Sequence, residues 1–199
     1  MTAQAPADRA LQTADYILSR LTSYFGNRSN HFSAFIDGNV HADGWLPAEA
    51  YFALSTPQAR KSTKVTFVRG KAQGSTRFDP DLELEINHEV HQLAVVPVLA
   101  TADNPLADQM DKGLAEVFQW LGRLKARSML YMVAFPAGIE DADWKAALAK
   151  AEQKYQTRAL GQLQFVIPRP PRPMVRAAAA LFLHASRVPK QAPPAPGRE

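Results

Sequence analysis

The chain has 199 residues, of which 46% are hydrophobic and 21% charged, the proportions of an ordinary globular protein. It contains no cysteine, which excludes disulfides, thiolate metal sites and cysteine nucleophiles. Lysine and arginine outnumber aspartate and glutamate by 23 to 19, and the excess is at one end. From Arg158 onward there are seven basic residues and one acid, a net charge of +6, whereas residues 1–157 carry −2. This distribution predicts an acidic or polyanionic partner for the C-terminal segment.

Hydropathy and length set the expected location and domain organisation. No apolar run reaches the ~18–20 residues that a membrane span needs, and the first residues lack the pattern of a secretory signal. We therefore expect a cytoplasmic protein with no membrane partner. The length favours one domain, placed at residues 8–187, between a disordered start at 1–7 and a disordered basic, proline-rich tail at 188–199.

The first elements alternate between helix and strand. Apolar residues recur at three- and four-residue steps over 8–25, which predicts a helix that ends at Gly26. Residues 31–36 are interpreted as a strand ended by Asp37 and Gly38. Pro47 suits the first turn of a short helix that runs to about residue 54.

Three strands are expected next. Residues 64–71 and 81–87 alternate apolar and polar side chains, and residues 93–99 are mostly apolar, as in a more central strand. In 81–87 the leucines and isoleucine are assigned to one face and the acids to the other. Residues 87–92 are interpreted as the hairpin connection.

The C-terminal half contains two helices with strands after them. Asn104-Pro105 is a strong helix start, so a helix is predicted at 105–124, followed by a strand at 129–135. A helix at 141–156 and a strand at 160–167 follow, a spacing compatible with a right-handed crossover between parallel strands. Residues 173–187 are interpreted as a last helix. The predicted fold class is α+β: a single domain with a mixed, mainly antiparallel sheet of five to six strands, flanked by three to four helices.

The first candidate nucleic-acid contact is an acid-free basic stretch between residues 50 and 78. Its basic residues are Arg60, Lys61, Lys64, Arg69, Lys71 and Arg77. Tyr51, Phe52 and Phe67 are interleaved with them. Lysines and arginines that hold phosphates beside rings that stack on bases are typical of single-stranded nucleic-acid binding. The alternative is that the aromatic residues belong to the core and the charges keep a strand edge soluble.

The second candidate contact is the segment that contains Arg169, Arg172 and Arg176. Four prolines at positions 168, 170, 171 and 173 surround the first two arginines. The arginines are suited to clamp phosphates, and the proline run is suited to a polyproline-reading protein partner. An ordinary solubilising tail is the remaining interpretation.

A stripe of acids is the candidate for metal chemistry. It comprises Asp79, Asp81, Glu83 and Glu85, with Glu89 beyond them. Carboxylates on one strand face are ligands for a hard cation such as Mg²⁺, but no (D/E)xK strand of the PD-(D/E)xK nuclease type accompanies them. The favoured interpretation is a solvated strand face paired with Arg69, Lys71 or Arg77.

Two further patterns are weaker. His88 and His91 are spaced as His-x-x-His, and we interpret them as turn residues without zinc. Phe35-Ile36-Asp37-Gly38-Asn39 resembles the first motif of NYN/PIN-type ribonucleases, which implies a metal-binding aspartate at Asp37. The resemblance covers five residues and the later acidic motif has no counterpart, so an Asp-Gly turn is favoured.

The sequence thus favours a non-enzymatic accessory protein that contacts nucleic acid, single-stranded by preference, through the basic stretch and the C-terminal arginines. A protein-interaction module that docks through its C-terminal segment or through an uncovered apolar helix face is the first alternative. A metal-dependent nuclease or hydrolase that uses the acidic stripe is the second. No cofactor is expected, and the question of catalysis stays open.

Overall fold

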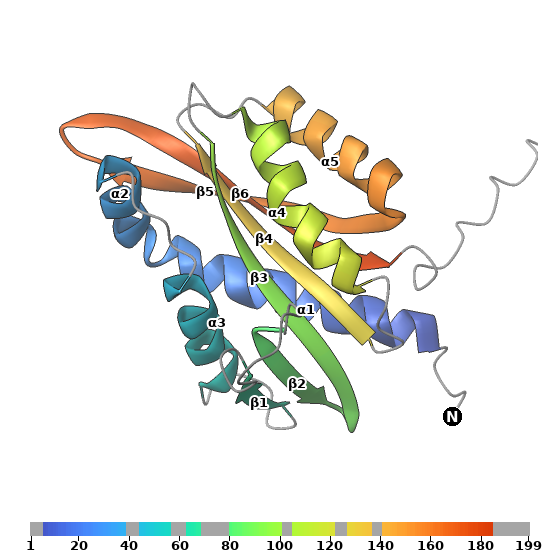
Figure 1. The fold of residues 1–199 in the computed structure, drawn as a ribbon. Helices are drawn as coiled ribbons and strands as arrows, with labels where there is room; N and C mark the ends of the chain where they lie inside the picture. Colours follow the sequence, from blue (N-terminus) through green and yellow to red (C-terminus); the bar gives the residue numbers. More distant parts are fainter. Residues whose placement is uncertain are drawn as a thin grey trace, which may run out of the picture.

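A six-stranded sheet separates two layers of helices in the computed structural model of the protein (Figure 1). The structure describes residues 6–38, 44–56, 63–68, 80–100, 105–121, 127–136 and 141–184. The helices are α1 (Pro6–Gly26), α2 (Ser29–Gly38), α3 (Trp45–Ser55), α4 (Leu106–Leu121) and α5 (Asp141–Tyr155). The strands are β1 (Thr63–Phe67), β2 (Leu82–Ile86), β3 (Glu89–Ala100), β4 (Arg127–Pro136), β5 (Thr157–Arg169) and β6 (Arg172–His184).

The strand order is β1-β2-β3-β4-β6-β5. Every neighbouring pair is antiparallel except β3 and β4, which run parallel and are joined in the chain by α4. The predicted α+β fold with a mixed, mainly antiparallel sheet is therefore confirmed, with six strands. The crossover through α5 joins two strands of the same direction, but β6 lies between them, because β4 and β5 both pair with β6.

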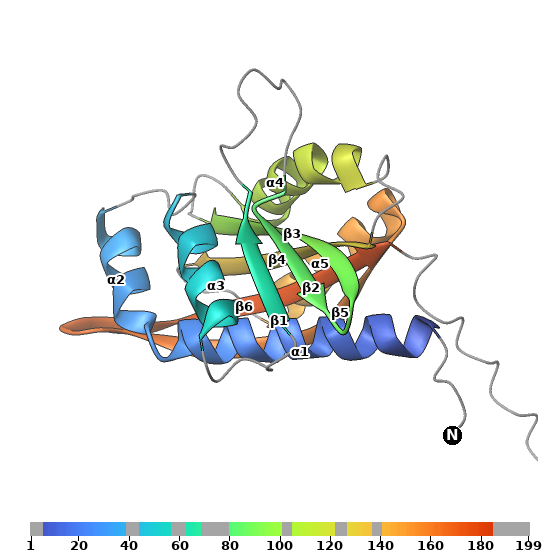
Figure 2. The same cartoon turned by 90° about the horizontal axis from the view of Figure 1, so that it is seen from below.

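The layer of α1, α2 and α3 covers one face of the sheet (Figure 2). The apolar stripe predicted on α1 is its buried face, with Ile17, Leu21 and Phe25 fully removed from solvent. Below it, the buried Thr22 and Tyr131 hydroxyls form a hydrogen bond of 3.1 Å between α1 and β4. Burial raises the pKa of Tyr131, so its hydroxyl stays protonated even at an alkaline pH that ionises an exposed tyrosine.

The layer of α4 and α5 covers the opposite face. Met110 and Leu114 of α4 and the fully buried Trp144 of α5 pack with the alanines of β6. The two helices are joined at their surface by Asp111, which accepts hydrogen bonds from Lys154 at 2.6 Å and from the Tyr155 hydroxyl at 2.7 Å. None of the described helices is both long and apolar enough to cross a membrane.

The hairpin between β2 and β3 is tighter than predicted. Asn87 and His88 have φ angles of 52° and 64°, as in the two-residue turns that match the twist of antiparallel strands. β3 consequently begins at Glu89, and the connection predicted at 87–92 is wrong beyond its first two residues.

The strand predicted at 31–36 is wrong, because these residues belong to α2. Phe32, Phe35 and Ile36 follow the i, i+3, i+4 spacing of a helix face, whereas Phe32, Ala34 and Ile36 alternate as in a strand. Six residues are too few to separate the two patterns. Phe32 is fully buried and decides the outcome by packing against Phe25 and Phe165.

The helix predicted at 173–187 is also wrong, because residues 172–184 form β6. Alanine favours helix intrinsically, and Ala177–Ala180 misled the prediction. In the structure these alanines are at most 2% exposed and lie between two strands and two helical layers. Tertiary burial on both faces outweighs the local preference.

The predicted start of the domain can be compared with the structure, whereas the predicted tail cannot. α1 begins at Pro6, two residues before the predicted domain start. The predicted tail at 188–199 and residues 1–5 lie outside the described residues.

We expect Ala179→Leu to lower the free energy of unfolding by about 1–3 kcal/mol, because added methylenes in a filled core force neighbouring atoms apart. Ala179 is fully buried and packs in the layer of α1. Urea denaturation measures the effect, and Ala149→Leu, at an exposed position of α5, is the matched control. Equal stability of the two variants would contradict the packing described here.

Candidate nucleic-acid interface

A long hairpin, here called the arm, consists of β5, the turn at Pro170–Pro171 and β6. Its tip extends beyond the rest of the sheet (Figures 1 and 2). Residues 157–184 include four arginines and no acid. One face of the arm is anchored, because Phe165 packs on Phe32 of α2 with ring centroids 5.5 Å apart. The arm is thus a basic ribbon fixed to the body along one side.

The other face of the arm near its tip is exposed. Val166 is paired with Arg176 across the two strands, and both side chains are open to solvent. Val166 is 50% exposed and Met174 is 71% exposed, the highest value among the large apolar side chains described. Apolar side chains therefore alternate with an arginine on an uncovered sheet surface.

Two of the predicted arginines meet at one carboxylate. Oδ1 of Asp37, in the last turn of α2, accepts hydrogen bonds from Arg169 Nε at 3.1 Å, from Arg169 Nη2, and from Arg172 Nη1 at 2.8 Å. The hydrogen bonds from Arg169 are the main cause that lowers the pKa of Asp37, and the charge of Arg172 adds to it. Asp37 is consequently ionised across the physiological range.

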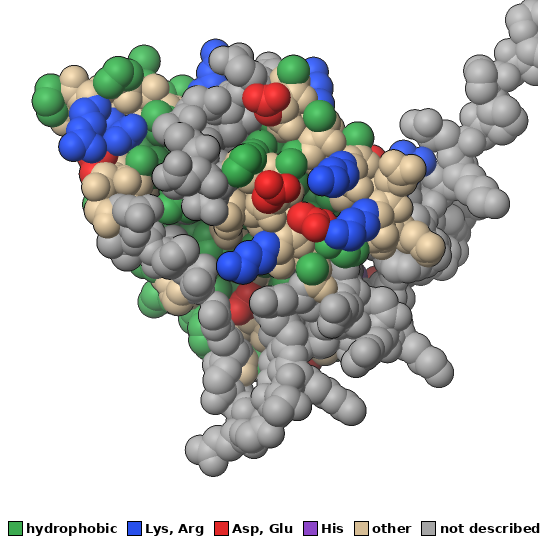
Figure 3. All heavy atoms as spheres, turned by 45° about the horizontal axis from the view of Figure 1, so that its top comes forward, with side chains coloured by type: hydrophobic (Ala, Val, Ile, Leu, Met, Phe, Trp, Pro, Cys, Tyr) green, Lys and Arg blue, Asp and Glu red, His purple; other side chains and the backbone are tan. Residues whose placement is uncertain are grey.

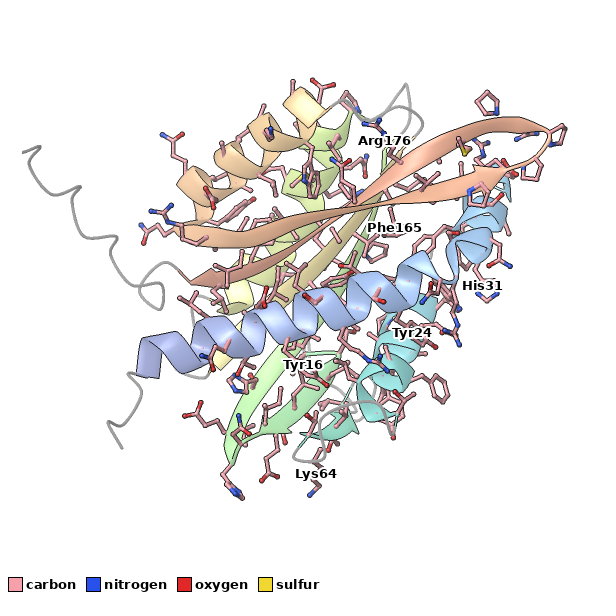
Figure 4. The ribbon with its side chains drawn as sticks, turned by 180° about the vertical axis from the view of Figure 1, so that it is seen from behind. Tyr16, Tyr24, His31, Lys64, Phe165 and Arg176 are labelled. Atoms are coloured by element: carbon pink, nitrogen blue, oxygen red, sulfur yellow. The ribbon has the colours of Figure 1, made fainter. Side chains whose placement is uncertain are left out.

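The residues of the predicted basic stretch do not join the arm where they are described. Lys64 is exposed on β1, opposite Glu85 of β2, and lies across the molecule from Arg176 (Figure 4). The other five basic residues of that stretch lie outside the described residues: Arg60, Lys61, Arg69, Lys71 and Arg77.

The aromatic residues of that stretch are mostly part of the core. Tyr51 and Phe67 are half-buried against the core and meet edge to face, with centroids 6.1 Å apart. Phe52 is 56% exposed on α3. One of the three rings is therefore available for stacking.

The described residues of the acidic stripe differ in exposure. Asp79 lies outside the described residues, and Asp81 is only 3% exposed, where its carboxylate accepts a hydrogen bond of 2.7 Å from the Val95 amide. Glu83 and Glu85 are half-buried on β2, opposite Thr66 and Lys64 of β1. Asp81 thus holds the backbone of β3 instead of sharing the solvated face predicted for it.

The remaining candidate ligands are also dispersed. His88 is exposed in the turn, whereas His91 is fully buried in β3. Asp37 lies in a helix, not at the strand end that the NYN/PIN resemblance implies, and Asn39 is outside the described residues. In the described part of the chain, no three His, Asp or Glu side chains are placed to hold a metal ion.

The rest of the visible surface differs from the arm in charge pattern. Figure 3 shows a group of basic side chains at the arm end of the molecule, while acidic and basic side chains are interspersed over the helical layer. α4 and α5 contribute both signs, as in the Asp111–Lys154 ion pair. In this view, basic side chains predominate at the arm end.

Sequence reasoning considered Asp37 only as a metal ligand or turn residue and missed its contact with the two arginines. Asp37 is 132 residues from Arg169 and 135 from Arg172, and the wrong strand assignment of α2 hid its position. An acid in the last turn of a helix is electrostatically unfavourable, which is the one local signal that it needs a cationic partner.

Comparison of the chain with models of protein families, with curated proteins and with solved structures finds no match in any of the three. The geometry of the arm is therefore the basis on which a function is proposed.

We expect Asp37→Asn to lose stability relative to the wild type at neutral pH, with the difference shrinking in acid. The folded pKa of Asp37 lies below the unfolded value, so its contribution is present above the unfolded pKa and is lost as pH falls through the folded pKa. Denaturant unfolding in steps from pH 7 to pH 3 measures it. Asp143→Asn, an exposed position on α5, is the control. A difference that grows in acid would contradict this assignment.

Proposed function

We propose that the protein is a non-enzymatic nucleic-acid-binding protein that acts through the arm. The observation that carries the proposal is the gathering of Arg169, Arg172 and Arg176 on one protruding hairpin without an acid of its own. Clustered arginines at a surface are suited to phosphates, because the guanidinium donates several hydrogen bonds in a fixed plane and stays charged.

The shape of the arm supports binding to a duplex. A two-stranded β-ribbon is narrow enough to enter the major groove, and several proteins place such ribbons in a groove. Single-stranded binding instead relies on exposed rings. The two rings in the described part of the arm are not exposed: Phe165 is half-buried against α2 and Phe182 is fully buried. The preference for single strands stays a prediction, to be tested in the same titration.

Met174 and Val166 add an apolar component to the arm. Proteins that deform DNA insert methionine, proline or other apolar side chains between base steps and surround them with basic residues. Met174 is flanked by Pro173 and lies two residues from Arg176 on the same strand face. This arrangement supports contact with bases beside contact with phosphates.

The protein-interaction module remains the second candidate function, because exposed apolar side chains on an uncovered sheet face also suit a protein partner. Part of the C-terminal segment assigned to that role lies outside the described residues.

A cysteine-free chain suits the reducing cytoplasm, where we propose that the protein acts.

We expect Arg172→Ala/Arg176→Ala to weaken oligonucleotide binding and to reduce the slope of log K against log salt concentration by about two, one for each lost phosphate contact. Fluorescence anisotropy with single- and double-stranded oligonucleotides over a salt series measures both quantities. The slope, and not the affinity at one salt concentration, identifies the phosphate contacts.

The matched control is Lys112→Ala/Lys145→Ala, which removes the same charge from exposed positions of α4 and α5. Its affinity should fall only slightly and its slope should stay near that of the wild type. Equal losses of affinity and slope in the two double variants would show that net charge alone causes the effect. Absence of salt-dependent binding by the wild type would overturn the proposal.

We expect Met174→Ser to weaken duplex binding while leaving the salt slope unchanged, because the substitution removes an apolar contact and no charge. Phe52→Ser, at an exposed apolar position on α3, is the control and should bind like the wild type. The same anisotropy titration measures both. A change in slope for Met174→Ser would show that the arm itself has been disturbed.

A further inference from the structure

The cluster of Arg169, Asp37 and Arg172 has the chemistry of an occupied anion site. Three N–H donors from two guanidinium groups converge on a single oxygen atom, Oδ1 of Asp37. The side chain of Arg169 is 12% exposed, that of Asp37 is 37% exposed and that of Arg172 is 60% exposed. The guanidinium of Arg169 is therefore held largely inside the protein, while the Asp37 carboxylate remains reachable from solvent.

The carboxylate is not placed there by the needs of its own helix. Asp37 lies in the last turn of α2, where the partial negative charge of the helix end repels an anion. The two arginines compensate for this repulsion. Arg169, whose side chain is largely removed from water, in turn requires an anion beside it, because an unpaired guanidinium in such a place is costly.

We propose that Arg169 and Arg172 form the binding site for one backbone phosphate of nucleic acid, and that Asp37 occupies this site in the free protein. A phosphate offers the same guanidinium donors a charged oxygen acceptor, so it replaces the carboxylate without leaving either arginine unpaired. The inference deepens the proposed function and rests on it. It adds a competitor inside the molecule that lowers the affinity for the ligand.

The competition has a measurable consequence. Asp37→Asn keeps the size of the side chain, removes the competing charge, and relieves the repulsion at the end of α2. We expect the variant to bind duplex oligonucleotide about fivefold more tightly than the wild type, the change that corresponds to one exposed ion pair. The salt slope should stay near that of the wild type, because the same phosphate occupies the site in both complexes and only the competing carboxylate is lost.

The experiment titrates a fluorescent duplex against the wild type, Asp37→Asn and the control Asp143→Asn over a salt series. Tighter binding by Asp37→Asn alone, cancelled in Asp37→Asn/Arg172→Ala, supports the inference. Asp37→Ser, checked for native folding by circular dichroism, must repeat the gain. If Asp37→Asn binds no more tightly than the wild type while Arg172→Ala/Arg176→Ala binds weakly, the competition is overturned and the proposed function stands.

A second probe separates this failure from failure of the proposed function. The Nε–Hε resonance of Arg169 is followed by NMR during addition of inorganic phosphate at constant ionic strength. A larger shift in Asp37→Asn than in the wild type supports the anion site even when neither protein binds the duplex, in which case nucleic acid is the wrong source of phosphate. Absence of a shift in both proteins overturns the site itself.

Discussion

The structure depends on small side chains in β6, the strand between β4 and the edge strand β5. Ala177 and Ala179 of β6 pack in the layer of α1, α2 and α3, while Ala178 and Ala180 pack in the layer of α4 and α5. Larger residues in this row would push at least one layer away from the strand. Because β6 also pairs with β4 on one side and β5 on the other, the alanines allow the two cores to close around the same strand. This is why the longest run of a good helix former in the chain is a strand.

The arm is held in place by the packing around β6. In its inner half, β6 is buried between the helical layers and pairs with β5 at the sheet edge. The outer half continues the same two strands, so the arginines near the tip are presented from a fixed base. α2 adds a second support, since Phe32 contacts Phe165 and Asp37 contacts both Arg169 and Arg172. A binding surface that is held in this way loses little conformational freedom when a ligand arrives.

Elements with one buried and one exposed face were predictable from the sequence, whereas elements decided by packing with distant segments were not. The stripe on α1 and the alternation in β2 were predictable because one face is buried and the other is not, and the N-cap pair at Asn104-Pro105 located α4 well. α2 and β6 were mistaken because packing with segments far away in the chain decided between two locally acceptable conformations. The arginines of the arm were predictable as a charge pattern. Their contact with Asp37 was not, since a separation of more than 130 residues leaves no trace in local spacing.

The position of β6 in the chain order also affects how the protein is made. β6 is the last described strand to be synthesised, yet it lies between β4 and the edge strand β5. Until it emerges from the ribosome, β4 has a free edge and β5 has no strand of this sheet to pair with. Such exposed edges invite pairing with other chains, and long-range strand pairing is slow. The nascent protein therefore passes through a stage in which its β1–β4 part is complete but its sheet is open, and this is the stage at which a chaperone has most to protect.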